Sequence, residues 1–180
     1  NKQAFEALGN FVAAFNEDVL GLVGDALDII VSAFENGIAL KQISGAIGLI
    51  ASSTNGEGKL SSYSGRICTN LCSILSGEID HIDNAYLFRF LWTLRILLEK
   101  GIIDPDCEDC GKVAPSLAEI FSKNDERNTL LSISIFELIP SASLTSLPGI
   151  KSGLQGQNLS HRIVNGYANL VVLCAEKDIV

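Results

Sequence analysis

Methionine is absent from this 180-residue chain, proline occurs only 4 times, and aromatic residues make up 7% of the sequence. Because proline interrupts helices, its scarcity allows long helices over most of the chain. Charged residues are also few, at 19%, while hydrophobic residues reach 47%. An intrinsically disordered chain has the opposite balance. The composition therefore predicts a folded chain with the length of one ordinary domain.

Basic residues are in the minority, with 13 Lys and Arg against 21 Asp and Glu and a net charge of −8. No stretch supplies the basic patch that nucleic-acid-binding proteins need, so we expect no nucleic-acid partner. Long apolar runs are missing as well. The best candidate, residues 85–98, contains Arg89 and Arg95 and is shorter than the about 20 residues that cross a bilayer. We therefore predict a buried helix there and no membrane span.

Recognisable catalytic and phosphate-binding motifs are also missing. The sequence contains no G-x-S-x-G nucleophile elbow, and no Gly-rich phosphate loop follows a predicted strand. Only two histidines occur, His81 and His161. Because serine is plentiful, the sequence does not exclude a Ser-His-Asp triad. It contains no recognisable pair of residues for general acid–base catalysis. We predict a chain that is not an enzyme, with no catalytic residues, no cofactor and no metal.

Apolar residues recur every three or four positions through most of the chain, and strand-like alternation is rare. This period is typical of amphipathic helices. It predicts an all-α fold, a single compact bundle of about seven to nine helices over residues 1–180, with no significant sheet. The expected helices are residues 3–15, 17–36, 38–52, 60–76, 82–100, 114–122, 126–138 and 161–176.

Three segments interrupt the helical pattern. Residues 53–59 (STNGEGK) are expected to form a flexible loop, and residues 104–111 (DPDCEDCG) an acidic loop that carries two cysteines. Residues 141–157 are rich in Ser, Gly and Pro and are expected to be only partly ordered, with a short turn of helix. Ser160 is a candidate N-cap for the last helix.

Two glycine pairs lie inside predicted helices at a spacing of three residues. They are Gly21 with Gly24, and Gly45 with Gly48. Glycine inside a helix costs about 1 kcal/mol relative to alanine. We therefore expect these glycines to mark positions where neighbouring helices pass very close to each other.

The five cysteines are the most informative residues. Cys68 and Cys72 are four apart and share one helix face, while Cys107 and Cys110 lie in the acidic loop. Cysteines on adjacent helical turns bond poorly to each other, so we predict that each pairs with one loop cysteine in two disulfides. Buried reduced thiols and a four-thiolate zinc site are the alternatives. Cys174 is then the odd thiol and a candidate for an interchain link.

Two further features are candidate sites. Asp80 and Asp83 flank His81 and would favour its protonated form near neutral pH, so these three residues form a candidate pH-sensitive cluster, with a plain exposed histidine as the alternative. Asn158 begins an Asn-Leu-Ser sequon, which is a glycosylation site if the chain is secreted.

Several segments resemble a known class of domain in their order and spacing. They are IIVSAFENG (residues 29–37), SGAIGLIASS (44–53), the apolar helix from Ala85, the GII turn (101–103) and VAPSLAEIF (113–121). Over about two thirds of the chain this layout is similar to the helical repeat domains of spider silk proteins, the egg-case (tubuliform) and wrapping (aciniform) spidroins. Those domains are Ser/Ala-rich, with few charges and few cysteines, and this chain departs from them in both respects.

The resemblance implies a structural, self-assembling helical domain of a secreted silk-like or matrix protein, whose partners are copies of itself or other structural chains. Two alternatives follow from the helical pattern. One is a helical carrier of an apolar ligand. The other is an armadillo- or HEAT-like scaffold for another protein, since helix pairs joined by Gly and Asn turns are typical of such arrays, although no 40-residue register recurs here. The localisation that we expect is extracellular, with cytoplasmic as the alternative.

Overall fold

The computed structural model describes residues 2–15, 21–77, 82–123 and 125–177. Within these residues the chain forms helices and turns, and no strand, which confirms the predicted all-α fold. Short 3-10 turns at Ser61–Tyr63 and Ile120–Lys123 accompany the helices. The helices are α1 (Lys2–Ala14), α2 (Leu22–Glu35), α3 (Leu40–Ser52), α4 (Gly56–Leu60), α5 (Ser64–Ser76), α6 (Asn84–Glu99), α7 (Glu108–Glu119), α8 (Glu126–Leu138), α9 (Pro140–Leu154) and α10 (His161–Lys177).

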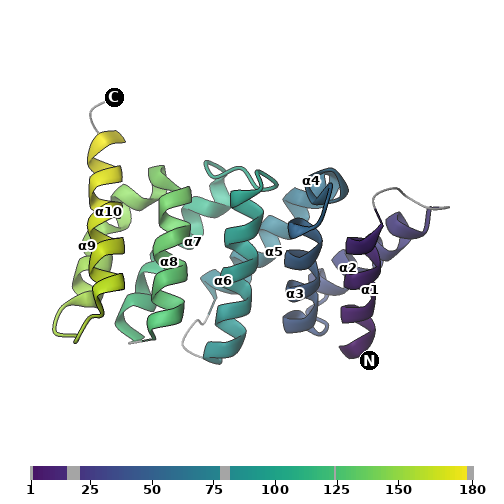
Figure 1. Cartoon of the computed structure of the whole chain (residues 1–180), viewed down its shortest axis with the longest axis horizontal. Helices are drawn as coiled ribbons and strands as arrows, with labels where there is room; N and C mark the ends of the chain where they lie inside the picture. The colour runs from purple at the N-terminus through teal and green to yellow at the C-terminus, as the bar shows by residue number, and fades with distance from the viewer. Residues whose placement is uncertain (1, 16–20, 78–81, 124, 178–180) are drawn as a thin grey trace.

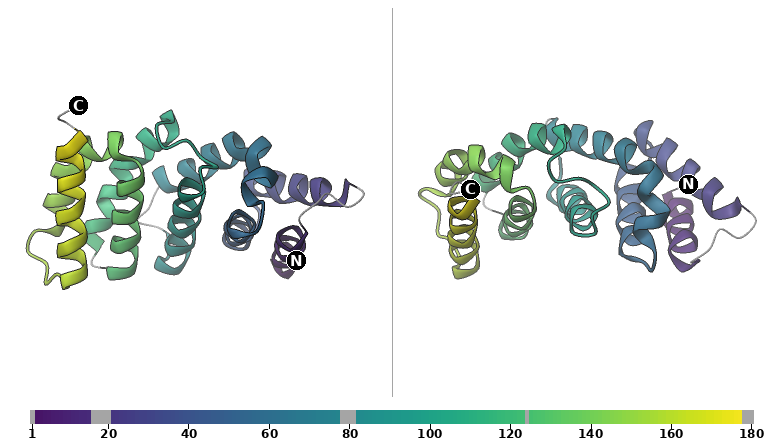
Figure 2. Two further views of the ribbon diagram at one scale, coloured as in Figure 1. Left: turned by 45° about the horizontal axis from the view of Figure 1, so that its top comes forward. Right: turned by 90° about the horizontal axis from the view of Figure 1, so that it is seen from above.

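The longer helices are arranged in two layers (Figure 1). In the first layer α1, α3, α6, α8 and α10 pack side by side, and in the second α2, α5, α7 and α9 do the same. Along the chain, helices of the first layer alternate with helices of the second layer. Seen from above, the array bends toward the first layer (Figure 2, right). We therefore call the first layer the inner layer and the second the outer layer.

A continuous apolar core fills the space between the two layers. Ile47 of α3 and Leu94 of α6 are fully buried from the inner layer, and Leu71 of α5 and Leu117 of α7 are fully buried from the outer layer. Each lies on the apolar stripe that the three- and four-residue spacing predicts for its helix. Burial of these stripes holds successive helices together along the whole array.

The predicted partly ordered segment, residues 141–157, is instead mostly helical. The helix α9 covers Pro140–Leu154, with Pro148 inside it. Ile150 and Leu154 are buried at helical spacing, and the Ser143 and Ser146 hydroxyls donate to backbone carbonyls, those of Ile139 and Ala142 among them. The prediction was wrong because the Ser/Gly/Pro composition concealed this apolar stripe, whose packing against α7 outweighs weak helix propensity.

The two predicted loops also contain helix. Residues 53–59 include most of α4, whose first residue, Gly56, packs directly on the carbonyl groups of Ile50 and Ala51. In the acidic segment α7 already begins at Glu108, because Glu108 and Asp109 are favourable in a first helical turn. The predicted start at residue 114 was therefore too late, and Pro115 lies inside the helix.

The inner-layer helices approach each other most closely at glycines. A Cβ at Gly9 of α1 would lie 2.5 Å from the Ala46 Cβ of α3. On the other side of α3, a Cβ at Gly45 would lie 3.3 Å from an Arg89 guanidinium nitrogen, and one at Gly48 would overlap the Trp92 ring. Gly45 and Gly48 therefore make room for side chains of α6, and the predicted close approach of the helices themselves stays a prediction at these two positions.

The other glycine pair behaves differently. Gly21 is the exposed N-cap of α2, with a φ of 76°, and a Cβ there would meet nothing within 4 Å. The prediction of close packing was wrong for Gly21, because this position needs the left-handed backbone that glycine adopts without strain. Gly24 is partly buried in the first turn of α2, and its close packing stays a prediction.

A buried hydrogen-bonded pair joins α3 to α6. Ser44 and Thr93 are both fully buried, and their hydroxyl oxygens are 3.0 Å apart. The Thr93 hydroxyl also lies 2.9 Å from the Ser44 carbonyl oxygen. Polar groups in an apolar interface need such partners, so this pair fixes the register between the two helices.

None of the helices in the described part of the chain combines the length and the apolar character that a bilayer-spanning helix requires.

The glycine contact of α1 with α3 can be tested by mutation. Gly9→Ala adds a methyl group against Ala46, so we expect the free energy of unfolding to fall by about 1–3 kcal/mol through overpacking. Gly65→Ala is the matched control, because a Cβ at this position of α5 meets nothing within 4 Å. Higher helix propensity should make the control neutral or stabilise it by up to about 1 kcal/mol. Urea unfolding followed by circular dichroism measures both, and equal stabilities would contradict the close approach.

The buried hydroxyl pair gives a second prediction. Thr93→Val keeps the shape of the side chain but leaves the Ser44 hydroxyl without its partner, so we expect a loss of about 1–3 kcal/mol of stability. Thr145→Val on α9 is the control, since Thr145 is exposed and should change stability by less than about 0.5 kcal/mol. If thermal and urea unfolding give the same small change for both variants, the pair does not hold α3 on α6.

Candidate functional site

The exposed side of the inner layer carries two adjacent clefts. One, of about 390 Å³, lies between α1, α3 and α6 and is lined by Glu6, Asn10 and Trp92 among others. The second, of about 450 Å³, lies between α3, α6 and α8. Lys41 and Arg89 line both clefts. The two clefts are therefore neighbours that share Lys41 and Arg89 in their walls.

Aromatic rings and cations are paired along these clefts. The Lys41 Nζ lies 4.6 Å from the centre of the Tyr86 ring, and the Arg89 guanidinium lies 5.9 Å from the centre of the Trp92 ring. At the α8 end, the Arg127 guanidinium lies 4.2 Å from the centre of the Phe88 ring of α6. These distances are typical of cation–π contacts. The six side chains form what we call the inner-face patch: Lys41, Tyr86, Phe88, Arg89, Trp92 and Arg127.

The sequence of α6 explains why these side chains share one face. Tyr86, Arg89 and Trp92 follow one another at a spacing of three residues, which keeps them near one side of a helix. Leu87 and Leu94 lie on the opposite side and are fully buried. Across from Arg89 and Trp92, α3 presents Gly45 and Gly48, so both long side chains lie over its backbone.

The cations of the inner-face patch are available to bind a ligand. Among the described residues, Lys41, Arg89 and Arg127 form no ion pair; the recorded pairs, such as Arg66 with Glu35, lie elsewhere. Asp125 lies at the edge of the patch, where its carboxylate accepts a hydrogen bond from the Asn128 backbone N–H. A cation above an aromatic ring keeps N–H groups that can donate to an anion. The patch can therefore bind a carboxylate and an apolar group side by side.

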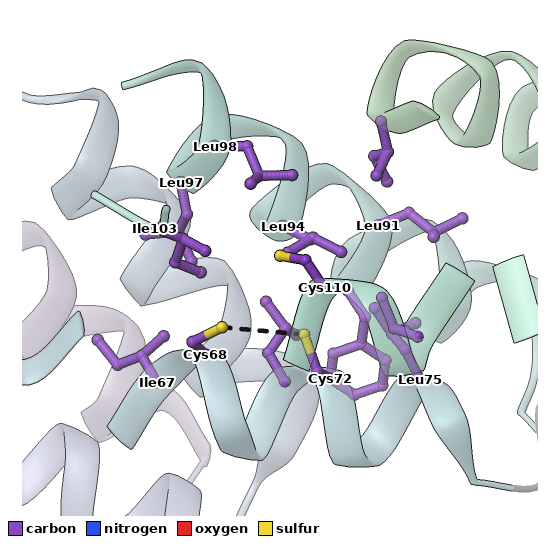
Figure 3. Packing of buried hydrophobic residues seen from close by; sticks show 14 of the residues in the cluster. Ile67, Cys68, Cys72, Leu75, Leu91, Leu94, Leu97, Leu98, Ile103 and Cys110 are labelled. Carbon is purple, nitrogen blue, oxygen red and sulfur yellow. Dashed lines mark hydrogen bonds between the residues drawn. The ribbon is translucent and has the colours of Figure 1, made fainter. Parts of the chain in front are cut away.

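A second candidate site lies in the outer layer. Cys68 and Cys72 extend from α5 toward Cys110 in the first turn of α7, within an apolar surrounding that includes Leu94 (Figure 3). The three sulfurs lie within 4.8 Å of one another. Cys107, the N-cap of α7, places its sulfur 3.7 Å from that of Cys68. The four cysteines singled out in the sequence therefore form one cluster.

The thiols of the cluster influence one another strongly. Hydrogen bonds from Cys110, and to a smaller extent from Cys72, lower the pKa of Cys68. Burial of Cys68 acts in the opposite direction but is weaker. Contacts with Cys68 and Cys72, followed by burial, raise the pKa of Cys110. Burial also raises the pKa of Cys107, although the backbone N–H of Cys110 donates to its sulfur. The lowered pKa of Cys68 and the raised pKa values of Cys107 and Cys110 indicate that these thiols interact and do not titrate independently.

The proximity that the disulfide prediction requires is present, but the disulfides themselves are not. None of the five cysteines is joined in a disulfide, and the Cys68 and Cys72 sulfurs are 4.0 Å apart, well beyond the about 2.05 Å of a disulfide. Disulfide pairing between α5 and α7 therefore stays a prediction. For Cys174 the expectation was wrong. It is 1% exposed, because it lies on the core-facing side of α10, and it cannot reach a second chain.

The remaining predicted sites are dispersed. Asp80 and His81 lie outside the described residues, and Asp83 is the N-cap of α6, where its carboxylate accepts a hydrogen bond from the Ala85 backbone N–H. Asn158 is exposed between α9 and α10, and its glycosylation stays a prediction. Ser160 caps α10 as predicted, through the Ile163 backbone N–H.

The inner-face patch was not predicted from the sequence. No run of basic residues marks it, because Lys41, Arg89 and Arg127 come from three separate helices. The available signal was the pairing of Tyr86 and Trp92 with Arg89 on one face of an otherwise apolar helix.

Comparisons with protein-family models, with curated proteins and with solved structures give no match to this chain.

Proposed function

We propose that this chain is a non-enzymatic helical scaffold that binds an acidic segment of a partner protein on its inner-face patch. The observation that carries the proposal is the patch itself, where three cations that form no ion pair with any described residue lie over aromatic rings. The chain as a whole has a net charge of −8. An acidic partner is repelled by most of this molecule, and the patch is where it meets favourable charge.

The architecture supports the same function. Arrays of helices in two layers have an extended curved surface, and repeat proteins use such surfaces to bind long segments of other proteins. Here the patch spans three neighbouring inner-layer helices, so an extended peptide can contact each of them in turn. Aromatic residues and arginine are also the residue types that contribute most to binding energy at protein interfaces.

The contacts further define the chemistry of the partner. Carboxylates of Asp or Glu would bind Lys41, Arg89 and Arg127, and apolar side chains between them would pack on Tyr86 and Trp92. Arginine can hold a carboxylate through two parallel hydrogen bonds. The expected partner is therefore a peptide segment in which acidic and apolar residues alternate.

The two other functions considered, a self-assembling secreted domain and a carrier of an apolar ligand, stay predictions. A self-assembling secreted domain receives no support from Cys174, whose thiol is buried. A carrier of an apolar ligand needs an apolar cavity, whereas the two clefts of the inner layer are open and lined by charged and polar side chains as well as aromatic ones. These observations favour the scaffold.

The single tryptophan of the chain provides the test, because Trp92 lies in the patch. We expect its fluorescence to change, with saturation, when a synthetic peptide of alternating Glu and Leu is added. Arg127→Glu should weaken the binding by about tenfold or more, since close charge pairs at interfaces contribute at least about 1.5 kcal/mol. Added salt should weaken binding too, because exposed charges are screened.

Lys151→Glu is the matched control for this titration. It changes the net charge by the same amount at an exposed position of α9 in the outer layer, so it should alter the affinity by less than about twofold. A peptide with Lys in place of Glu should not bind. Equal binding of the Lys peptide, or an unchanged affinity of Arg127→Glu, would contradict the proposed function.

A further inference from the structure

Three of the four clustered cysteines, Cys68, Cys72 and Cys110, have sulfurs as close together as the ligands of a thiolate metal site. Four sulfurs around a tetrahedral zinc ion at about 2.3 Å lie about 3.8 Å from one another. The Cys68 sulfur is 3.7 Å from that of Cys107 and 4.0 Å from that of Cys72. Cys110 lies within 4.8 Å of both α5 sulfurs. The Cys107 sulfur contacts that of Cys68 but lies outside this group of three, so its side chain must turn toward the other two to supply a fourth ligand.

The surroundings of the cluster suit a buried thiolate centre. Cys107 and Cys110 occupy the N-cap and first turn of α7, where the positive end of the helix dipole stabilises negative sulfur. The first backbone N–H groups of a helix have no partner within the helix. Such groups can orient metal ligands and offset the charge of a site with four thiolates.

The carboxylates of the acidic segment are engaged elsewhere and leave the sulfurs as the ligand set. Asp109 accepts a hydrogen bond from the Thr69 hydroxyl, and Glu108 pairs with Lys112. Asp106 accepts a hydrogen bond from Ser141. An all-sulfur tetrahedral set favours zinc over magnesium or calcium, which prefer oxygen ligands.

The cluster is closed to solvent except on one side. Cys68, Cys72 and Cys110 are buried, whereas Cys107 is partly exposed. Cys68 and Cys107 line a small surface pocket of about 190 Å³. A metal ion can enter by this route, and once bound it would have no open position for substrate, as is typical of structural zinc.

We propose that Cys68, Cys72, Cys107 and Cys110 bind one zinc ion as four thiolates. The ion replaces the four thiol protons, which leave to solvent, and no cysteine is oxidised. The site joins the middle of α5 to the start of α7, two outer-layer helices that are neighbours in the array. It is independent of the inner-face patch and of whatever binds there.

Elemental analysis of the full chain, purified under reducing conditions without added chelator, tests the site. We expect one zinc per chain, and five free thiols after denaturation in the presence of chelator. Cys107→Ser should lower the zinc content to less than one tenth. Because Cys107 is partly exposed, this substitution disturbs the core least. Cys174→Ser is the control, since it removes a buried cysteine from α10 and should leave one zinc per chain.

A second measurement does not depend on any variant folding. Cobalt(II) added to the wild-type chain after zinc removal should give the visible spectrum of a tetrahedral thiolate complex, and stoichiometric zinc should abolish that spectrum. The proposal is overturned if the purified chain holds iron instead of zinc, or if neither zinc nor cobalt binds. It is also overturned if the intact mass lacks four hydrogens, because the four cysteines are then two disulfides.

Discussion

Helix α3 contacts both of its inner-layer neighbours at places where one partner is a glycine, and the spacing of these three helices depends on the contacts. Gly9 of α1 packs on Ala46, and Gly45 and Gly48 face Arg89 and Trp92 of α6. A larger residue at these positions would separate the helices and expose the core between the layers. The same contacts place Arg89 and Trp92 across α3, beside Lys41. One packing constraint therefore sets both the spacing of the array and the composition of its inner surface.

The two layers differ in what they contribute. The apolar core holds both layers, and the outer layer adds polar and sulfur contacts, including the exposed ion pair of Arg66 with Glu35 between α2 and α5 and the cysteine cluster between α5 and α7. The inner layer relies on close packing and on the buried Ser44–Thr93 pair, which leaves its outward side free for cations and rings. A rigid outer layer would keep the inner-layer helices at fixed distances, as a binding surface requires for preorganised contacts.

The helices could be predicted from the sequence wherever the apolar period was strong. The bounds of α8 were predicted to the residue. The failures have physical causes. In α9 a buried apolar stripe that includes Ile150 and Leu154 packs on α7 and outweighs a composition that disfavours helix. Gly21 serves a left-handed turn rather than a contact. Lys41, Arg89 and Arg127 meet only through tertiary packing, so no local pattern in the sequence could reveal their patch.

The central claim is that binding takes place on the inner layer, and backbone NMR of the isotope-labelled chain tests it most directly. Addition of the acidic peptide should shift the amide resonances of the exposed sides of α3, α6 and α8, together with the Trp92 indole N–H. Resonances of α2, α5, α7 and α9 should remain in place. Shifts confined to outer-layer helices, or a spectrum that does not change at saturating peptide, would contradict the account.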